Sequence, residues 1–583
     1  MISRENKFWK FKFSSKNQST TWRLQNYWKW FLFLIVIALV LWVVFTYDYK
    51  TNSSYGLEVF KNNIKKLFIF QDQSTFRDGG NLWFKSLSYL WSNLKLAISG
   101  TFIGFIFALI SSFLANKNFV NKYVAYIGIS LIFVLRALPE IVFITLISRS
   151  LESAEAVLFL VYIWFSWLWL HKYFAELYKD IDLKFYFLSI QMGNTKIKSF
   201  TKEVWPKFKN KALSLFLFSF ESNIRWSSLL SSLGLIGIGL LTEHATKGGG
   251  SKISELLIPL IVLVSFILFI ELLNYVLAKY VFVHFSFKFS NKKKNKKLFL
   301  KSWQKYLIVI FVLSTVIFSI WTSSTLNYSF LKNNFFNAYL SNLFKPDYSV
   351  FSLNEFSIEK NLILQSFQTW AHAFFVFVIM CFFVFLILPF LVHSQQRKIT
   401  VISFQTLIVI FRTVPVIVLF YIFSVLFNST ALVVLFLLGV HNSCSFLKQL
   451  SEYANNLNQT KINQLKLLGW NKRQIYFKHI LPCLKIHIIT LSTIYFEIIF
   501  KSVILYSFLS TTEFSLGGYM YSHLNAKSYN PNKAFAYMWL IVLNILILNT
   551  INYVIIRKTK FNTPLFSLDL LKRKSYFLFR KKF

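Results

Sequence analysis

Long apolar stretches alternate with polar ones along the whole chain. Most of them reach about 20 residues, the length that an α-helix needs to cross the hydrocarbon core of a bilayer. Six lie near 30–47, 90–114, 123–150, 154–170, 210–240 and 256–284, and six near 305–323, 363–392, 401–427, 431–446, 486–509 and 536–556. The pattern predicts an all-α polytopic membrane protein with about 12 transmembrane helices, because a β-barrel would show short alternating segments instead.

Several sequence features recur at a constant spacing of 276 residues. The recurring pairs are Arg136 and Arg412, Pro139 and Pro415, Gly193 and Gly469, Pro206 and Pro482, Phe220-Glu221 and Phe496-Glu497, and Arg225 and Lys501. Composition alone could match one such pair, but hardly all of them in one register. The sequence therefore predicts two tandem copies of a six-helix unit.

The repeat divides the chain into five predicted segments. They are a basic leader 1–29, a first six-helix repeat 30–284, a basic linker 285–304, a second six-helix repeat 305–556 and a basic tail 557–583. With six spans in each half, leader, linker and tail lie on one side, and their positive charge predicts that this side is cytoplasmic. The first apolar stretch lacks a cleavage site and is predicted to remain as an uncleaved span. We thus expect a multi-pass cell-membrane protein with both termini in the cytoplasm.

Composition narrows the class further. The chain is 55% hydrophobic and its formal net charge is +41, but the basic residues mostly flank apolar spans, so cytoplasmic loops explain them better than nucleic acid does. The three cysteines, Cys381, Cys444 and Cys483, are far apart and are predicted to pack in the core. No metal or other cofactor is predicted.

Glycine-rich groups are the remaining candidates for nucleotide chemistry. The group from Gly248 to Lys252 has the wrong spacing for a Walker A phosphate loop. Gly100 and Gly104 form a weak helix-packing motif. We therefore predict that the chain is not an enzyme and that any ATP is hydrolysed on another chain.

Two polar segments, 171–209 and 447–485, lie between the fourth and fifth predicted spans of each half. Each holds a glycine and, thirteen residues later, a proline: Gly193 and Pro206, then Gly469 and Pro482. Glycine permits a turn between two short helices, and proline suits the start of the next helix. The matched copies predict two cytoplasmic elbows that dock a partner with two equivalent clefts. The alternative is a basic amphipathic helix that lies on anionic membrane lipid.

These elbows resemble the EAA loop of binding-protein-dependent ABC-importer permeases. The loop's pattern is Glu-Ala-Ala, three residues, Gly, and nine residues before Ile-x-Leu-Pro, and the residues that match it are Gly193, Pro206, Gly469, Leu481 and Pro482. At the acidic position the chain has Phe187 and Asn463 instead. The stretch "FESNIRWSSLLSSLGLIGIG" (220–239) resembles the phosphonate-type permeases, and "FEIIFK" (496–501) repeats it in part.

The resemblance covers about 90–280 and 366–556. Because two copies are joined, it extends to the large permeases of mycoplasma high-affinity transport systems. It implies the permease subunit of an ABC import system that moves a phosphonate, a phosphate ester or thiamine pyrophosphate. An ABC ATPase subunit, as two copies or two related chains, would dock on the elbows, and an extracellular lipoprotein would deliver the substrate. The alternative is a twelve-helix ion-coupled secondary transporter.

Charged residues lie within the predicted spans. A charge at the bilayer centre costs on the order of 2.5–3.5 kcal/mol on insertion scales, so such residues need partners or water. Glu221 precedes Arg225 by four positions, the favourable order for an ion pair within one helix, and Glu497 and Lys501 repeat the spacing. Two interpretations stay open: each pair neutralises itself, or the residues line the translocation path.

The candidate path residues are Arg136, Glu221, Asn223, Arg225, Arg412, Glu497 and Lys501. Arg136 has Glu140 four positions later, whereas Arg412 has Val416 there. We therefore predict that Arg412 is the central cation without an acid on its own helix. Such a cation would be the most available to an anionic substrate.

Overall fold

The computed structural model forms two compact units. Unit A comprises 51–345 and 413–426, and unit B comprises 1–50, 346–412 and 427–583. The structure describes residues 3–7, 10–15, 18–24, 26–46, 54–77, 79–247, 252–280, 296–330, 333–455, 457–509, 516–524 and 529–561. Most of the predicted tail, the first part of the linker and four of the five residues 248–252 lie outside the described residues.

Unit A is built from α-helices. They are α2 (Ser54–Leu67), α3 (Leu82–Leu114), α4 (Lys122–Ala137), α5 (Glu140–Ser150), α6 (Ala154–Asp180), α7 (Lys184–Gln191), α8 (Lys196–Ser199), α9 (Trp205–Ser232), α10 (Gly239–Lys247), α11 (Leu257–Tyr280), α12 (Lys296–Thr325), α13 (Asn333–Leu343) and α16 (Val416–Phe423). Short 3-10 turns occupy Ile253–Leu256 and Ser424–Leu426, and a π-helical turn occupies Phe200–Val204.

Unit B repeats much of this succession. Its helices are α1 (Asn26–Thr46), α14 (Leu362–Leu391), α15 (Lys398–Thr413), α17 (Thr430–Asn455), α18 (Gln459–Leu467), α19 (Lys472–Ile475), α20 (Leu481–Tyr506), α21 (Leu516–Leu524) and α22 (Pro531–Phe561). A π-helical turn occupies Tyr476–Ile480, and 3-10 turns occupy Tyr348–Val350 and Ser507–Leu509. The predicted leader contains a small antiparallel sheet, β1 (Ser3–Lys7), β2 (Lys10–Ser15) and β3 (Gln18–Leu24), which the sequence analysis did not anticipate.

The predicted all-α polytopic fold is confirmed for the apolar part of the chain. Among the described residues, eight helices are long and apolar enough to cross a membrane, and the pairs α4–α5 and α15–α16 count as two more if each is one broken span. The other two predicted spans correspond to α1 and α9. The apolar part of α1, Phe33–Thr46, is short, and α9 carries several polar and charged side chains.

Helix boundaries recur at the same spacing as the sequence features. α4 ends at Ala137 and α15 at Thr413, while α8 spans 196–199 and α19 spans 472–475, each pair 276 residues apart. Pro139 and Pro415 are the N-caps of α5 and α16. Proline disfavours helical backbone at the preceding residue, which explains why α4 and α15 end just before these residues. The bend between α4 and α5 is 81°.

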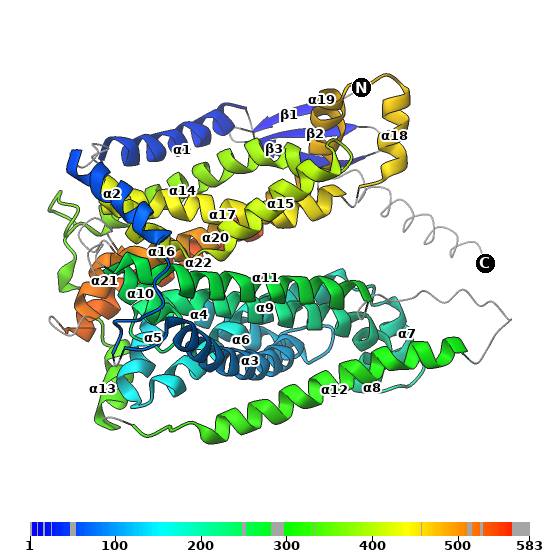
Figure 1. Ribbon diagram of the computed structural model, residues 1–583. Helices are drawn as coiled ribbons and strands as arrows, with labels where there is room; N and C mark the ends of the chain where they lie inside the picture. Colours follow the sequence, from blue (N-terminus) through cyan, green and yellow to red (C-terminus); the bar gives the residue numbers. More distant parts are fainter. Residues whose placement is uncertain are drawn as a thin grey trace, which may run out of the picture. The chain divides into compact units, whose positions relative to one another are not determined.

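The first helix of each sequence repeat packs with the helices of the other repeat. In unit B, α1 lies along α14, where the rings of Trp42 and Phe367 are 5.5 Å apart (Figure 1). In unit A, α12 packs on α3, and the Ser99 hydroxyl donates to the Thr322 hydroxyl over 3.0 Å. The compact units therefore exchange their first helices relative to the repeats 30–284 and 305–556, which divide the sequence.

The predicted packing role of Gly100 and Gly104 is confirmed. They lie on α3 where it meets α6, and a Cβ at Gly104 would stand 2.7 Å from the carbonyl oxygen of Ile163. At Gly100 it would stand 2.8 Å from the Cβ of Tyr162. Because these distances are shorter than van der Waals contact, the two helices can approach this closely only where a side chain is absent.

Candidate elbows and membrane charges

Both elbow glycines end a helix in the left-handed conformation. The φ angle is +88° at Gly193 and +80° at Gly469. After α18, the Gly469 N–H donates to Lys466 O and the Trp470 N–H donates to Leu465 O, over 3.0 and 3.1 Å. These two bonds define a Schellman motif, which satisfies the last carbonyls of the helix, and the same pair of bonds follows α7. The predicted glycine turn therefore exists at both positions.

The rest of each elbow also follows one plan. A four-residue helix, α8 or α19, runs into a π-helical turn, Phe200–Val204 or Tyr476–Ile480, and then directly into α9 or α20. Pro206 and Pro482 are the second residues of those long helices and directly follow the π-helical turns. Such π-helical turns are rare and frequently occur at functional sites. A displacement of either elbow therefore acts on the start of a long helix.

The first elbow is anchored by a few buried groups. The Tyr186 hydroxyl donates to Asn118 O over 3.2 Å, and the Ser199 hydroxyl donates to the Ser189 hydroxyl over 3.0 Å. At its start, Asp182 accepts the backbone N–H of Lys184, and this bond lowers the pKa of the Asp182 carboxyl.

The second elbow is held mainly by apolar side chains. Ile462, Ile475 and Ile480 are fully buried, and Asn471 forms a capping box with Gln474 at the start of α19. Asn463, which stands at the acidic position of the family's loop, is exposed.

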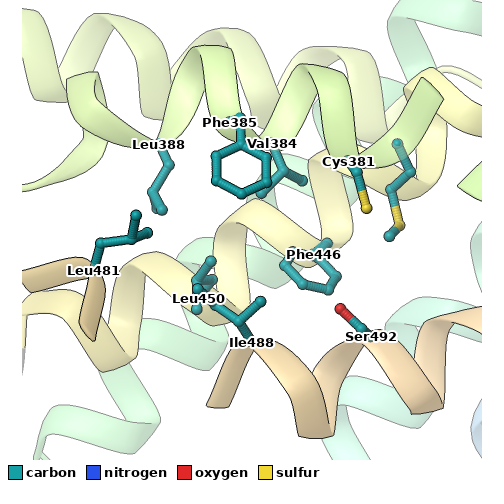
Figure 2. A pocket seen from close by; sticks show the side chains of 10 residues that line it. Cys381, Val384, Phe385, Leu388, Phe446, Leu450, Leu481, Ile488 and Ser492 are labelled. Carbon is teal, nitrogen blue, oxygen red and sulfur yellow. The ribbon is translucent and has the colours of Figure 1, made fainter. Parts of the chain in front are cut away.

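Leu481 faces the interior of unit B. It lines a small apolar cavity between α14, α17 and α20, together with Leu388 and Leu450 (Figure 2). Pro482, the next residue, is exposed. Of these two predicted docking residues, only Pro482 therefore presents a largely free surface, and Leu481 connects the elbow to the helix bundle.

The two predicted ion pairs within α9 and α20 are present. A guanidinium nitrogen of Arg225 lies 3.4 Å from a carboxylate oxygen of Glu221, and the Lys501 ammonium lies 3.6 Å from Glu497. The Glu221 side chain is 1% exposed. Because each cation follows its acid by one helical turn, each pair forms within a single helix.

Asn223 joins three helices of unit A. Its amide nitrogen donates to the hydroxyls of Thr101 on α3 and Ser166 on α6, over 2.7 and 2.8 Å. Both bonds are buried, so the side chain is engaged in holding α9 against its neighbours. The sequence analysis placed Asn223 among the path residues without foreseeing this structural role, because Thr101 and Ser166 are distant in sequence.

One premise about Arg136 is wrong. Arg136 lies in the last turn of α4, and Glu140 is the first residue of α5, beyond the 81° bend. The two residues therefore do not share a helix, and the absence of a same-helix acid does not distinguish Arg412 from Arg136. Burial does distinguish them, since Arg412 is 1% exposed at the end of α15, whereas Arg136 is half-buried.

A polar cluster in unit A went unnoticed in the sequence. The Glu255 carboxylate accepts the backbone N–H and the hydroxyl of Thr75, over 3.0 and 2.7 Å. His244 Nε2 lies 3.0 Å from that hydroxyl and 3.2 Å from the Lys252 ammonium. We call Thr75, His244, Lys252 and Glu255 the clasp. It joins the α2–α3 loop to the segment before α11, and only the fold brings residues about 180 apart together.

The cysteine prediction is partly wrong. Cys444 is buried, but Cys483 is exposed beside Pro482 on the second elbow, and Cys381 is half-buried. Among the described residues, no group of three or more His, Cys, Asp or Glu side chains is placed to hold a metal ion.

Comparison with known protein families identifies the family to which the chain belongs. Residues 100–283 and 394–560 each match the family described as "Binding-protein-dependent transport system inner membrane component". The two matches correspond to the two repeats and together cover more than half of the chain. The chain belongs to this family.

Two relatives and one solved structure are similar to the chain. The ABC transport system permease protein p69 of Mycoplasma genitalium is 27% identical over 486 residues, which cover 83% of this chain and 87% of the relative. The protein of that name from Mycoplasma pneumoniae is 26% identical over 398 residues, 68% of this chain and 72% of the relative. A chain from the crystal structure of an amino acid ABC transporter with histidines aligns with a TM-score of 0.30 and 15% identity, over 33% of this chain and 92% of that one.

Membership of the binding-protein-dependent transport family decides between the two transporter classes that the sequence left open. The chain is the permease subunit of an ABC transport system, which resides in a membrane. Permeases of this kind work with ATPase and substrate-binding partners. The elbows and the buried ion pairs recur in both family copies, which makes them the candidate working parts of this permease.

Proposed function

We propose that this permease imports a small anionic phosphorus-containing solute and that ATP is hydrolysed on separate ABC ATPase chains docked at its two elbows. The observation that carries the proposal is the duplicated elbow: a Schellman glycine, a π-helical turn and a proline in the same order at 193–206 and 469–482. An element built twice at one spacing suits a partner with two equivalent clefts.

The elbows provide a route from ATP hydrolysis to the membrane. Each π-helical turn continues into α9 or α20 without a break, and these helices carry the Glu221–Arg225 and Glu497–Lys501 pairs. Closure of the ATPase would move both elbows together and tilt both helices. This coupling would alternate the access of the path between the two sides of the membrane. We place the elbows and both termini in the cytoplasm, on the basis of the basic leader, linker and tail.

The substrate class rests on the cations of α9, α15 and α20 and on the "FESNIR" stretch. Arginine offers parallel donors to two phosphate oxygens, which a lysine ammonium cannot match. Arg225 and Lys501 already hold a carboxylate each, so a bound phosphate or phosphonate would compete with that acid. Arg412 is a further buried cation of unit B.

Uptake into proteoliposomes tests the proposal. The permease is reconstituted with its ATPase chain and its binding lipoprotein, and labelled phosphonate, phosphate ester or thiamine pyrophosphate is added outside. ATP-dependent uptake of one of these supports the proposal. Uptake that needs an ion gradient and no ATP contradicts it, and ATP-dependent uptake of neutral sugars or amino acids alone contradicts the substrate class.

Two arginine variants test whether the cations contribute to transport. Arg412→Gln should reduce uptake more than Arg136→Gln at equal membrane abundance, because water screens the charge of the buried Arg412 guanidinium less than that of the half-buried Arg136, so its charge acts more strongly on an anion. Arg412→Lys should recover part of the loss. Full uptake by a normally abundant Arg412→Gln protein removes Arg412 from the path.

A further inference from the structure

The tip of each elbow exposes large apolar side chains. Leu467 and Leu468, directly before the Gly469 turn, are 88% and 73% exposed. On the first elbow, Met192 and Ile197 flank the Gly193 turn and are 75% and 69% exposed. Burial of one such side chain is worth about 1.5–3 kcal/mol, so these tips are positioned to gain free energy from a partner.

Cations surround these tips. From α18 to the start of α20, residues 457–482 of the second elbow contain no Asp or Glu, and the lysines and arginine there are Lys461, Lys466, Lys472, Arg473 and Lys478, all exposed. On the first elbow Lys196, Lys198 and Lys202 are exposed. The two acids there are not free at the tip, because Asp182 is engaged with Lys184 and Glu203 is half-buried.

We infer that the ATPase surface that receives each elbow is an apolar socket rimmed by Asp and Glu carboxylates. This inference rests on the proposed docking of the ATPase at the elbows. Exposed leucine and methionine tips require an apolar floor, and a rim of three to five cations requires opposite charge, because like charges facing each other cost several kcal/mol. Both elbows carry net positive charge and exposed apolar side chains at the tip, which lets two copies of one ATPase chain serve both.

The shape of the second elbow favours a protein over anionic lipid. A helix that lies on a bilayer presents one continuous apolar face along its length. Here the isoleucines Ile462 and Ile475 of the short helices are buried, and the exposed leucines gather at the turn between α18 and α19. A small apolar knob with a cationic collar fits a socket better than a flat surface.

Charge reversal tests the inference. The Lys472→Glu/Arg473→Glu variant reverses two cations of the second elbow, and an acid at the start of α19 is compatible with the helix dipole. The matched control, Arg397→Glu/Lys398→Glu, reverses two exposed cations at the start of α15. Affinity for the purified ABC ATPase chain of the same transport system is measured with the permease in nanodiscs of phosphatidylcholine alone. A second set of nanodiscs contains anionic phosphatidylglycerol in addition to phosphatidylcholine.

We expect the elbow variant to lose affinity about tenfold or more in both lipids, and the control to keep it. Salt at about 1 M, where the Debye length is about 3 Å, should weaken the wild type and leave the variant little changed. Equal affinity of elbow variant and wild type overturns the acidic socket. A loss confined to the anionic nanodiscs overturns it in favour of lipid.

The failure of the inference and the failure of the proposed docking are distinguishable. If Gly469→Val lowers ATPase affinity while the charge reversal does not, the ATPase docks at the elbow through a socket that is not acidic. If neither variant lowers affinity, the proposed docking itself is wrong.

Discussion

Replacing Gly469 with valine should uncouple the permease without unfolding it. The residue has a φ angle of +80°, and no atom other than those of its own chain neighbours lies within 4 Å of the position that a Cβ would take. The added side chain therefore meets no neighbour, and its cost is confined to the backbone conformation. That conformation brings Cβ of an L-residue too close to its own chain.

The expected cost follows from this geometry. Left-handed backbone costs an L-residue about 1–2 kcal/mol, and a β-branched side chain lies at the upper end or beyond. The population of the native turn relative to alternatives falls by a factor of about 5–30. A folded domain typically has about 5–15 kcal/mol of stability, so the subunit as a whole stays folded. The loss falls on the Schellman turn that fixes the direction of α19.

ATPase copurification and ATP-dependent uptake measure the effect. The Gly469→Val permease should insert into the membrane at normal abundance. It should copurify with much less ATPase and lose most of its ATP-dependent uptake. Gly469→Asn should retain much more, because asparagine tolerates the left-handed conformation better than other side chains. Gly128→Ala is the matched control, since its Cβ would lie 3.6 Å from Ala115 in ordinary contact.

Two results would refute the reasoning. Normal uptake by a permease with both Gly469→Val and Gly193→Val would show that the elbow turn is not needed for coupling. Equal loss in the asparagine and valine variants would show that backbone conformation is not the cause.

Three further predictions concern packing, charge and pH. In Gly104→Ala the new Cβ would stand 2.7 Å from the Ile163 carbonyl oxygen and from the Ser166 Cβ, which forces α3 and α6 apart. This variant should destabilise the purified permease by about 1–3 kcal/mol, while Gly128→Ala should not. An unchanged melting temperature for Gly104→Ala would contradict this. Glu221→Gln breaks a buried pair and should cost about 3–5 kcal/mol of stability, and adding Arg225→Gln should restore much of it; no restoration in thermal unfolding would mean that the pair is not the source of the loss. Burial and the neighbouring lysine ammonium lower the pKa of His244 below its usual 6.5, so an opened clasp binds protons more readily and its stability should fall as the pH drops below about 6.5. Hydrogen exchange of the α2–α3 loop, corrected for its intrinsic pH dependence, should rise there, and His244→Gln should remove that rise; an equal rise in both proteins would exclude the histidine.

The sequence predicted local features of the elbows and ion pairs well. A glycine with a proline thirteen residues later indicated a turn and a helix start, because both depend on the backbone preferences of single residues. Glu221 and Arg225 formed the expected pair because four positions along one helix fix their separation. The same rule failed at Arg136 and Glu140, where the intervening Pro139 ended the helix. The proline was visible in the sequence, but apolar residues continue on both sides of it, so the whole stretch 123–150 was predicted as one span.

By itself, the sequence determined the class of the protein, its duplication and the conformation of its elbows, since these follow from hydrophobic length, constant spacing and local backbone preference. Only the tertiary structure decided that α1 packs with α14 and α12 with α3, that Asn223 bridges three helices, and that Glu255 holds Thr75. These contacts join residues from 57 to 325 positions apart. Their formation depends on which helix faces meet after the chain has packed, and no periodicity along the sequence carries that information.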